Sequence, residues 1–175
     1  MIFHETSIPG AYLIDIKRIE DERGYFARAW CQNEFRQNNL KYDFVQTNVG
    51  FSKCTGTLRG MHFQNNPYQE VKLIRCTRGA VYDVAVDLRA NSPTYKKWLG
   101  VELNEDNSSM LYIPEGCAHG YLTLADNSEI CYMTTQFYMP EYAAGVRFND
   151  PAFGIQWPIK ILTLSEKDLN WPEYI

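Results

Sequence analysis

Apolar and polar positions alternate with a period of two through the middle of the chain. The run 77–89, TRGAVYDVAVDLR, is apolar at every even position from Tyr82 to Leu88. This pattern is typical of a β-strand with one face packed on a core. The opposite side of the same strand carries Asp83 and Asp87 between small apolar residues, so we expect these acids to face either solvent or the lumen of a barrel.

Further strand-like runs end in Gly, Pro, Asn or Asp turn chemistry, which indicates many short strands. They occupy residues 72–89, 97–104, 109–116, 120–124 and 128–138. Helical patterns are short and lie outside this region, at 31–39 and at 164–170, where Ser165 is an expected N-cap. The sequence therefore predicts an all-β fold, a sandwich or jelly-roll barrel with short peripheral helices and one domain over 1–175, able to hold a ligand in its mouth.

The segment 56–64, GTLRGMHFQ, places an arginine and a histidine in a predicted strand. Strict alternation puts Arg59 and His62 on opposite faces, but a bend at Gly60 would bring both to one cavity. The simpler alternative is an edge strand with a solvated arginine and a hydrogen-bonded core histidine.

Length and composition fit a globular protein that binds neither membrane nor nucleic acid. The chain has 175 residues, 45% of them hydrophobic, and no apolar run is long enough to cross a bilayer. Its formal charge of −4, without any basic block, argues against a nucleic-acid surface, although one or two phosphates fit a local site. Five scattered cysteines without a Cys-x-x-Cys pair predict free thiols. With no signal-peptide pattern at the start, we expect a cytoplasmic protein.

One motif resembles those of cupins, the barrel class whose members often bind a metal through histidines. The stretch IPEGCAHG matches the second cupin motif, ending at His119, but the first motif is incomplete because HFQNNPYQE offers only His62, Gln64 and a late Glu70. The chain has three histidines, and His4 lies near the terminus. A three-histidine metal site is therefore not expected.

Taken together, several segments resemble the dTDP-4-dehydrorhamnose 3,5-epimerase family, in its order and spacing, from about residue 5 to 168. They are DERGYFARAW, FVQTN, GTLRGMHFQ, VKLIRCTRGAVYDVAVDLRANSPTYKKWLGVEL, LYIPEGCAHGYLTL and FNDPAFGIQWP. The resemblance implies a cupin-type double-stranded β-helix and a homodimer that exchanges strands. It also implies a nucleoside-diphosphate 4-keto-6-deoxy sugar as substrate, inverted at C3, C5 or both, and no metal or organic cofactor.

The resemblance also implies roles for single residues. His62 corresponds to the catalytic base, Asp168 to its carboxylate partner, Tyr132 to the acid on the other face of the sugar, and Lys72 to a cation that stabilises the enolate. The substrate-binding positions that it implies are Arg23, Gln46, Asn48, Arg59, His119, Tyr138 and Lys167.

These residue types suit the implied chemistry. A proton beside a ketone is removable only if the charge that develops on the ketone oxygen is stabilised, and a fixed cation in a dry pocket does this. Inversion then needs a base on one face and a proton donor on the other, for which an imidazole and a phenol are suitable. Taken alone, Tyr132 fits packing, Lys72 a solvated strand position and Asp168 a helix surface.

Two positions depart from the family pattern, and several functions stay open. Arg28 and Ala143 stand where many members carry glutamate, which leaves the nucleotide and sugar preference undecided. The alternatives are an epimerase acting at one carbon, a ketoisomerase or an enzyme for a CDP-linked sugar. More distant alternatives are a metal-dependent cupin such as a dioxygenase, and a non-catalytic sugar-binding cupin.

Overall fold

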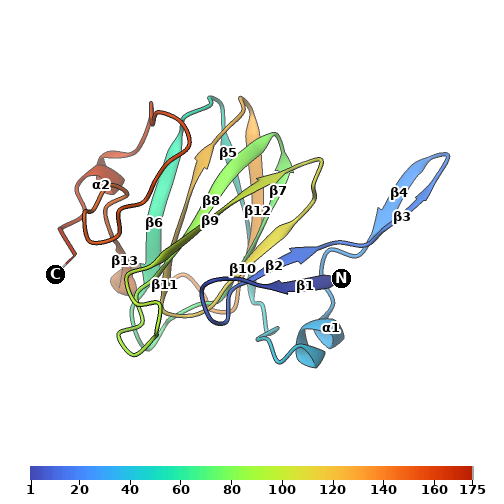
Figure 1. Cartoon of the computed structure of the whole chain (residues 1–175), viewed down its shortest axis with the longest axis horizontal. Coiled ribbons are helices and arrows are strands. Elements are labelled where there is room, and N and C mark those ends of the chain that lie inside the picture. Colours follow the sequence, from blue (N-terminus) through green and yellow to red (C-terminus); the bar gives the residue numbers. More distant parts are fainter. Residues whose placement is uncertain (175) are drawn as a thin grey trace.

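The computed structural model describes residues 1–174 and is built almost entirely of antiparallel strands (Figure 1). The six-stranded sheet runs in the order β1 (Ile2–Glu5), β2 (Tyr12–Asp15), β10 (Met110–Ile113), β7 (Lys72–Arg78), β12 (Ser128–Thr134), β5 (Gln46–Ser52). The five-stranded sheet runs in the order β13 (Ala143–Gly145), β6 (Leu58–Gln64), β11 (Cys117–Thr123), β8 (Ala80–Asp87), β9 (Trp98–Asn104).

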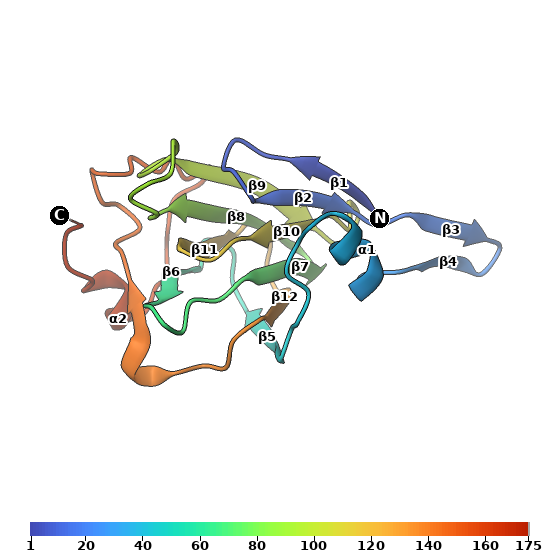
Figure 2. The same ribbon diagram turned by 90° about the horizontal axis from the view of Figure 1, so that it is seen from below.

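The chain crosses repeatedly between the two sheets, as in a jelly roll. After β7 in the six-stranded sheet, it forms β8 and β9 in the five-stranded sheet, returns for β10, and alternates again with β11 and β12. Figure 2 shows the two sheets as stacked layers. The predicted all-β cupin fold is confirmed, and every predicted strand run contains a strand.

Short helices lie at the two predicted places. They are α1 (Gln32–Gln37) and α2 (Glu166–Leu169), with one 3₁₀ turn, η1 (Pro140–Tyr142). The Ser165 side chain caps α2 by accepting the backbone N–H of Asp168 at 3.1 Å, as its position in the sequence predicts. None of the helices within residues 1–174 has the length and apolar character needed to cross a membrane.

The core lies between the sheets, where the inward faces of both meet. Ile74 and Ile130 from the six-stranded sheet pack with Val81, Ala85 and Leu103 from the five-stranded sheet, and all are at most 1% exposed. Asp83 and Asp87 share the face of Val81 and Ala85 and are fully buried. Of the two environments predicted for these acids, the lumen of the barrel is therefore correct and exposure to solvent is wrong.

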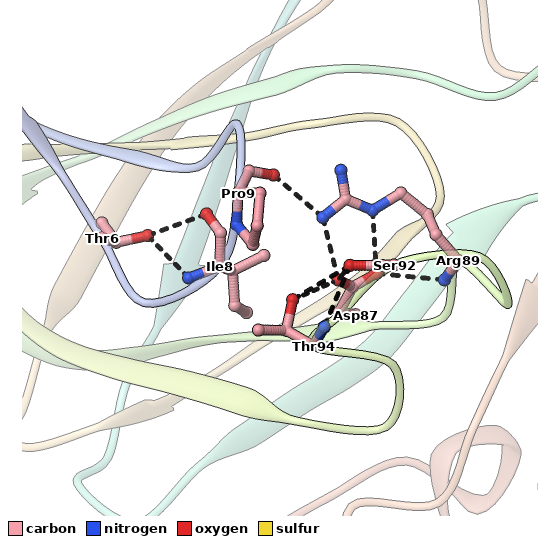
Figure 3. Close-up of polar contacts among 7 residues, drawn as sticks. All are labelled: Thr6, Ile8, Pro9, Asp87, Arg89, Ser92 and Thr94. Atoms are coloured by element: carbon pink, nitrogen blue, oxygen red, sulfur yellow. Dashed lines mark hydrogen bonds and ion pairs between the residues drawn. The ribbon is translucent and has the colours of Figure 1, made fainter.

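Asp87 is held by a dense set of donors near the end of β8 (Figure 3). Its carboxylate accepts hydrogen bonds from the backbone N–H and guanidinium of Arg89 and from the hydroxyls of Ser92 and Thr94. Arg89 also donates to the carbonyl of Pro9 at 2.9 Å. The network therefore ties the loop after β8 to the turn between β1 and β2.

A two-stranded hairpin, β3 (Arg18–Asp21) and β4 (Gly24–Ala27), projects from the body of the molecule (Figures 1 and 2). It carries Ile19 and Phe26 with 65% and 71% of their surface exposed. Such apolar exposure on a projecting hairpin is typical of a contact surface rather than of a free arm.

Candidate active site

A cavity of about 830 Å³ opens between the two sheets. Its walls come from β5, β7 and β12 on one side and from β6 and β11 on the other, with α2 closing one edge. Ten of the eleven predicted site residues line it: Gln46, Asn48, Arg59, His62, Lys72, His119, Tyr132, Tyr138, Lys167 and Asp168.

A bulge in β6 brings Arg59 and His62 to the same cavity. The two residues are three apart on β6, yet their partners Tyr121 and His119 are only two apart on β11. The extra residue falls at Gly60, whose φ is +137° and whose Cβ, if present, would lie 2.4 Å from the Cα of Gly120. Only glycine fits there, and the predicted bend is confirmed.

His62 and Asp168 form a hydrogen-bonded pair at the edge closed by α2. The His62 Nε2 lies 2.6 Å from Asp168 Oδ1, and Oδ2 accepts the N–H of Gly60 at 3.4 Å. Burial alone would raise the pKa of Asp168, but these hydrogen bonds and the charge of His62 lower it below its usual value. The carboxylate side chain is 6% exposed and the imidazole 43% exposed, so the pair presents its histidine to the cavity.

Tyr132 and Lys72 lie on the opposite wall, in the six-stranded sheet. Burial and the nearby Glu70 raise the pKa of Tyr132, which keeps the phenol protonated at neutral pH. The Nζ of Lys72 is 3.1 Å from Glu70 Oε1 and donates to the carbonyl of His62 at 3.2 Å. The Lys72 side chain is 9% exposed, and its ammonium group is fixed by contacts to Glu70 and to the backbone of β6.

A second histidine–aspartate pair is formed by His119, which lines the cavity, and Asp83 behind it. The His119 Nε2 lies 3.0 Å from both carboxylate oxygens of Asp83, which is fully buried. The rings of His119 and Tyr121 are stacked, with 6.3 Å between their centroids. Burial raises the pKa of Tyr121 to about 12. His119 is 7% exposed, so its imidazole is oriented by Asp83 at the cavity wall.

The mouth of the cavity is organised by amide and guanidinium groups. Gln46 Oε1 accepts the N–H of Tyr138 at 2.6 Å, which holds the 59%-exposed tyrosine beside the opening. Arg59 donates to the carbonyl of Phe51 at 3.0 Å and to the hydroxyl of Ser52 at 3.3 Å. A cationic and an aromatic side chain therefore flank the entrance.

The residues of the incomplete metal motif have other partners here. His62 pairs with Asp168, Glu70 with Lys72, and the Gln64 side chain binds backbone groups of the 137–139 loop. No group of three or more metal-ligating side chains occurs within residues 1–174.

Arg23 is the one predicted site residue that does not line this cavity. It lies on the projecting hairpin, its side chain is 84% exposed, and it pairs with Asp21. The two positions that depart from the family pattern lie in different places. Ala143 lines the cavity. The Arg28 side chain is 62% exposed and pairs with Glu34 at 3.2 Å.

Three further side chains at the site were not predicted for it. They are Glu70, Asp83 and Trp171, the last of which packs edge-to-face near His62 at 6.4 Å between ring centroids. An acid within an apolar strand row, as at Asp83, is a sequence signal for a buried polar pair. No local pattern marks Trp171, because only the return of the C-terminal segment to the sheet brings it there.

The arrangement can remove a proton from one face of a ligand and deliver one to the other. His62 and Asp168 lie in or beside the five-stranded sheet, and the phenol of Tyr132 lies in the six-stranded sheet. A buried ammonium group between them can stabilise an oxyanion.

Comparisons with known proteins agree with this geometry. The family model described as dTDP-4-dehydrorhamnose 3,5-epimerase matches residues 5–174. A protein of that name from Methanothermobacter thermautotrophicus is 46% identical over 172 residues, covering 97% of this chain and 92% of the relative.

Solved structures superpose over nearly the whole chain. A dTDP-4-dehydrorhamnose 3,5-epimerase from Bacillus anthracis, with TDP and PPi bound, has a TM-score of 0.96 and 38% identity, covering 99% of each chain. A 3′-monoepimerase from Streptomyces bikiniensis in complex with dTDP-quinovose has a TM-score of 0.90 and 33% identity, covering 97% of this chain and 86% of that one. The chain belongs to the dTDP-4-dehydrorhamnose 3,5-epimerase family.

Proposed function

We propose that this protein is a cofactor-independent epimerase of a dTDP-linked 4-keto-6-deoxyhexose in deoxysugar biosynthesis, inverting C3 and C5. The observation that carries the proposal is the opposition of His62–Asp168 and Tyr132 across one cavity. A racemising or inverting proton transfer needs groups on both faces of the carbon, whereas sugar binding alone does not.

In the proposed reaction, His62 takes the proton from the carbon beside the ketone. Asp168 fixes the imidazole and stabilises the imidazolium that forms. The electron pair moves into the ring as an enolate, whose oxygen is stabilised by the ammonium of Lys72. Tyr132 then gives its proton to the opposite face of the carbon, and exchange with water returns both side chains to their starting states.

The number of inverted carbons is the main alternative within this function. The relatives include both 3,5-epimerases and a 3′-monoepimerase. The cavity lining around His62, Lys72 and Tyr132 contains the groups needed at either carbon, so we assign both carbons to the same base.

The test is incubation in D₂O with dTDP-4-keto-6-deoxyglucose, followed by NMR of the sugar protons. We expect deuterium at C3 and C5 and the product inverted at both. Deuterium at C3 alone would establish a monoepimerase. Absence of exchange with the dTDP sugar, together with exchange in a CDP-, UDP- or GDP-linked sugar, would overturn the proposed nucleotide.

We further propose that the protein acts as a homodimer in the cytoplasm, with the hairpin of each subunit reaching the site of the other. The exposed Ile19 and Phe26 on the hairpin support a covered surface, as do Val49 and Phe51, which are 65% and 42% exposed on the edge strand β5. Arg23 then meets substrate in the partner's cavity rather than in its own. The five free cysteines are compatible with a reducing compartment.

Mixing two impaired variants tests this arrangement. Arg23→Ala and His62→Ala should each be impaired as homodimers, but subunit exchange should create heterodimers with one site that contains both residues. Recovery of activity on mixing supports the exchanged hairpin. A dimer without recovery, or a monomer by sedimentation, contradicts it.

A further inference from the structure

Trp171, which the sequence did not predict to lie at the site, packs against two of the predicted site residues. Its indole lies edge-to-face to the imidazole of His62, with 6.4 Å between ring centroids and 69° between planes. The Nζ of Lys167 lies over the same indole, 5.4 Å from its centroid, within cation–π range. One side chain therefore contacts both a group assigned to proton transfer and a group assigned to ligand binding.

The sheet is shaped to receive this ring. Gly145 is the register partner of His62 on β13, and a Cβ at Gly145 would lie 2.3 Å from Cε2 of Trp171. The indole thus rests directly on the backbone beside the histidine. The φ of Gly145 is not positive, so the steric demand of Trp171 is what requires glycine there.

Packing, not hydrogen bonding, holds the indole. Its Nε1–H is buried and meets no acceptor within residues 1–174. The segment around it is fixed at both ends: Ser165 caps α2, Glu173 pairs with Arg147 at 2.7 Å, and the N–H of Tyr174 donates to Asp150 at 2.9 Å.

We infer that Trp171 is a positioning residue of the active site, which fixes the imidazole plane of His62 while Asp168 fixes its distance and tautomer. A hydrogen bond to one carboxylate oxygen leaves the ring free to rotate about that contact. An aromatic wall on its flank removes this freedom. The inference rests on the proposed function, because it gives the histidine the role of base.

The kinetic test compares Trp171→Ala, Trp171→Phe and Gly145→Ala. Misplacement of a reacting group by about 1 Å lowers turnover by about 100-fold, so we expect Trp171→Ala to lower kcat by about 10–100-fold with a smaller change in KM. Trp171→Phe should recover most of kcat, because packing is retained and no hydrogen bond is lost. Gly145→Ala should reproduce the loss by displacing the indole.

A double-mutant cycle links the two positions. Because both changes act through the same ring, Gly145→Ala in the Trp171→Ala background should cause little further loss. The matched control is Trp157→Ala, which removes an indole that packs on Tyr82 and donates to the carbonyl of Phe148, outside the cavity. That variant should lower the melting temperature without changing kcat.

Imidazole NMR separates this inference from the proposed function. Only three histidines are present, so the His62 signals are assignable by His62→Asn. We expect Trp171→Ala to shift the His62 ring signals and leave those of His4 unchanged, whether or not any sugar is turned over. If Trp171→Ala lowers the melting temperature but changes neither kcat nor the His62 signals, the residue is structural and the inference is wrong.

Discussion

Asp87 and Asp168 are both buried carboxylates with cationic or ionisable partners, but their partners face different surroundings. Asp87 is saturated by Arg89, Ser92 and Thr94, all within seven residues along the chain, and lies outside the cavity lining. Asp168 binds His62, which is 106 residues away and 43% exposed to the cavity.

The difference separates a carboxylate that holds only its own loop from one whose partner faces the cavity. Burial of a charge is tolerated where hydrogen bonds compensate it, and Asp87 meets that requirement with donors from the loop that follows it. Asp168 instead hydrogen-bonds His62, whose imidazole is open to a ligand in the cavity. The same type of side chain thus holds a loop in one place and, in the proposed mechanism, orients the base in the other.

The largest expected effect is on catalysis, from Asp168→Asn. The amide keeps the size of the side chain but cannot stabilise an imidazolium, and the same change in a comparable triad lowers turnover by about 10⁴-fold. Steady-state kinetics and thermal unfolding should show a large fall in kcat with a small change in Tm. Asp87→Asn is the matched control, with kcat retained; equal loss of kcat in both would remove the distinction.

The next largest effect on catalysis is expected from Lys72→Ala, which removes the buried cation of the cavity. Removing one preorganised oxyanion donor costs about 2.7–4 kcal/mol of transition-state stabilisation, so kcat should fall more than substrate affinity. Arg89→Ala, the cation beside Asp87, should instead lower stability and leave kcat unchanged. Normal turnover of Lys72→Ala at saturation, with weak binding, would make Lys72 a uniform binding group.

Asp87→Asn should lower the free energy of unfolding by about 3 kcal/mol, near the lower end for breaking a buried ion pair. The lower end applies because the Arg89 side chain is 30% exposed and regains water. Urea unfolding at pH 7 measures the change. A loss below about 1 kcal/mol would mean that Ser92, Thr94 and Pro9 hold the loop without the charge.

The smallest expected effect is on the free energy of unfolding at acidic pH, through the titration of Asp87. Burial raises the pKa of Asp87, but its hydrogen bonds outweigh burial and lower the pKa from 3.8 to about 2. Because the pKa of Asp87 is lower in the folded state, its ionised form stabilises the fold at every pH above the pKa of the unfolded chain. That stability is lost as pH falls from about 4 to 2, and the difference between the two pKa values corresponds to about 2 kcal/mol. Urea titrations across this range should show a shallower decline in Asp87→Asn, whereas parallel curves would exclude this contribution.

Periodicity and turn residues, which are local signals, were sufficient for the all-β class, and the family resemblance was needed for the cupin fold and for most of the cavity. The strands β6 to β12, both helices and the Ser165 cap follow from such signals, whereas β1 to β5 and β13 carried no pattern that was recognised. The ten residues that line one cavity came from the resemblance to the family. The bulge at Gly60 was open to prediction only as one of two alternatives, since alternation alone opposes Arg59 and His62.

Features that depend on distant segments were not predictable in the same way. Asp83 meets His119 through the pairing of β8 with β11, and Trp171 meets His62 because the C-terminal segment returns to β13. Arg23 shows the converse: its motif matches the family, but its position on the hairpin takes it away from the cavity of its own chain.

Solvent-deuterium exchange in two variants tests the opposition of the walls most directly. With dTDP-4-keto-6-deoxyglucose in D₂O, His62→Ala should abolish exchange at C3 and C5, because the base is gone. Tyr132→Phe should keep measurable exchange with less inverted product, because abstraction persists without the proton donor on the other face. Equal and complete loss of exchange in both variants, with native folding, would contradict the two-wall mechanism.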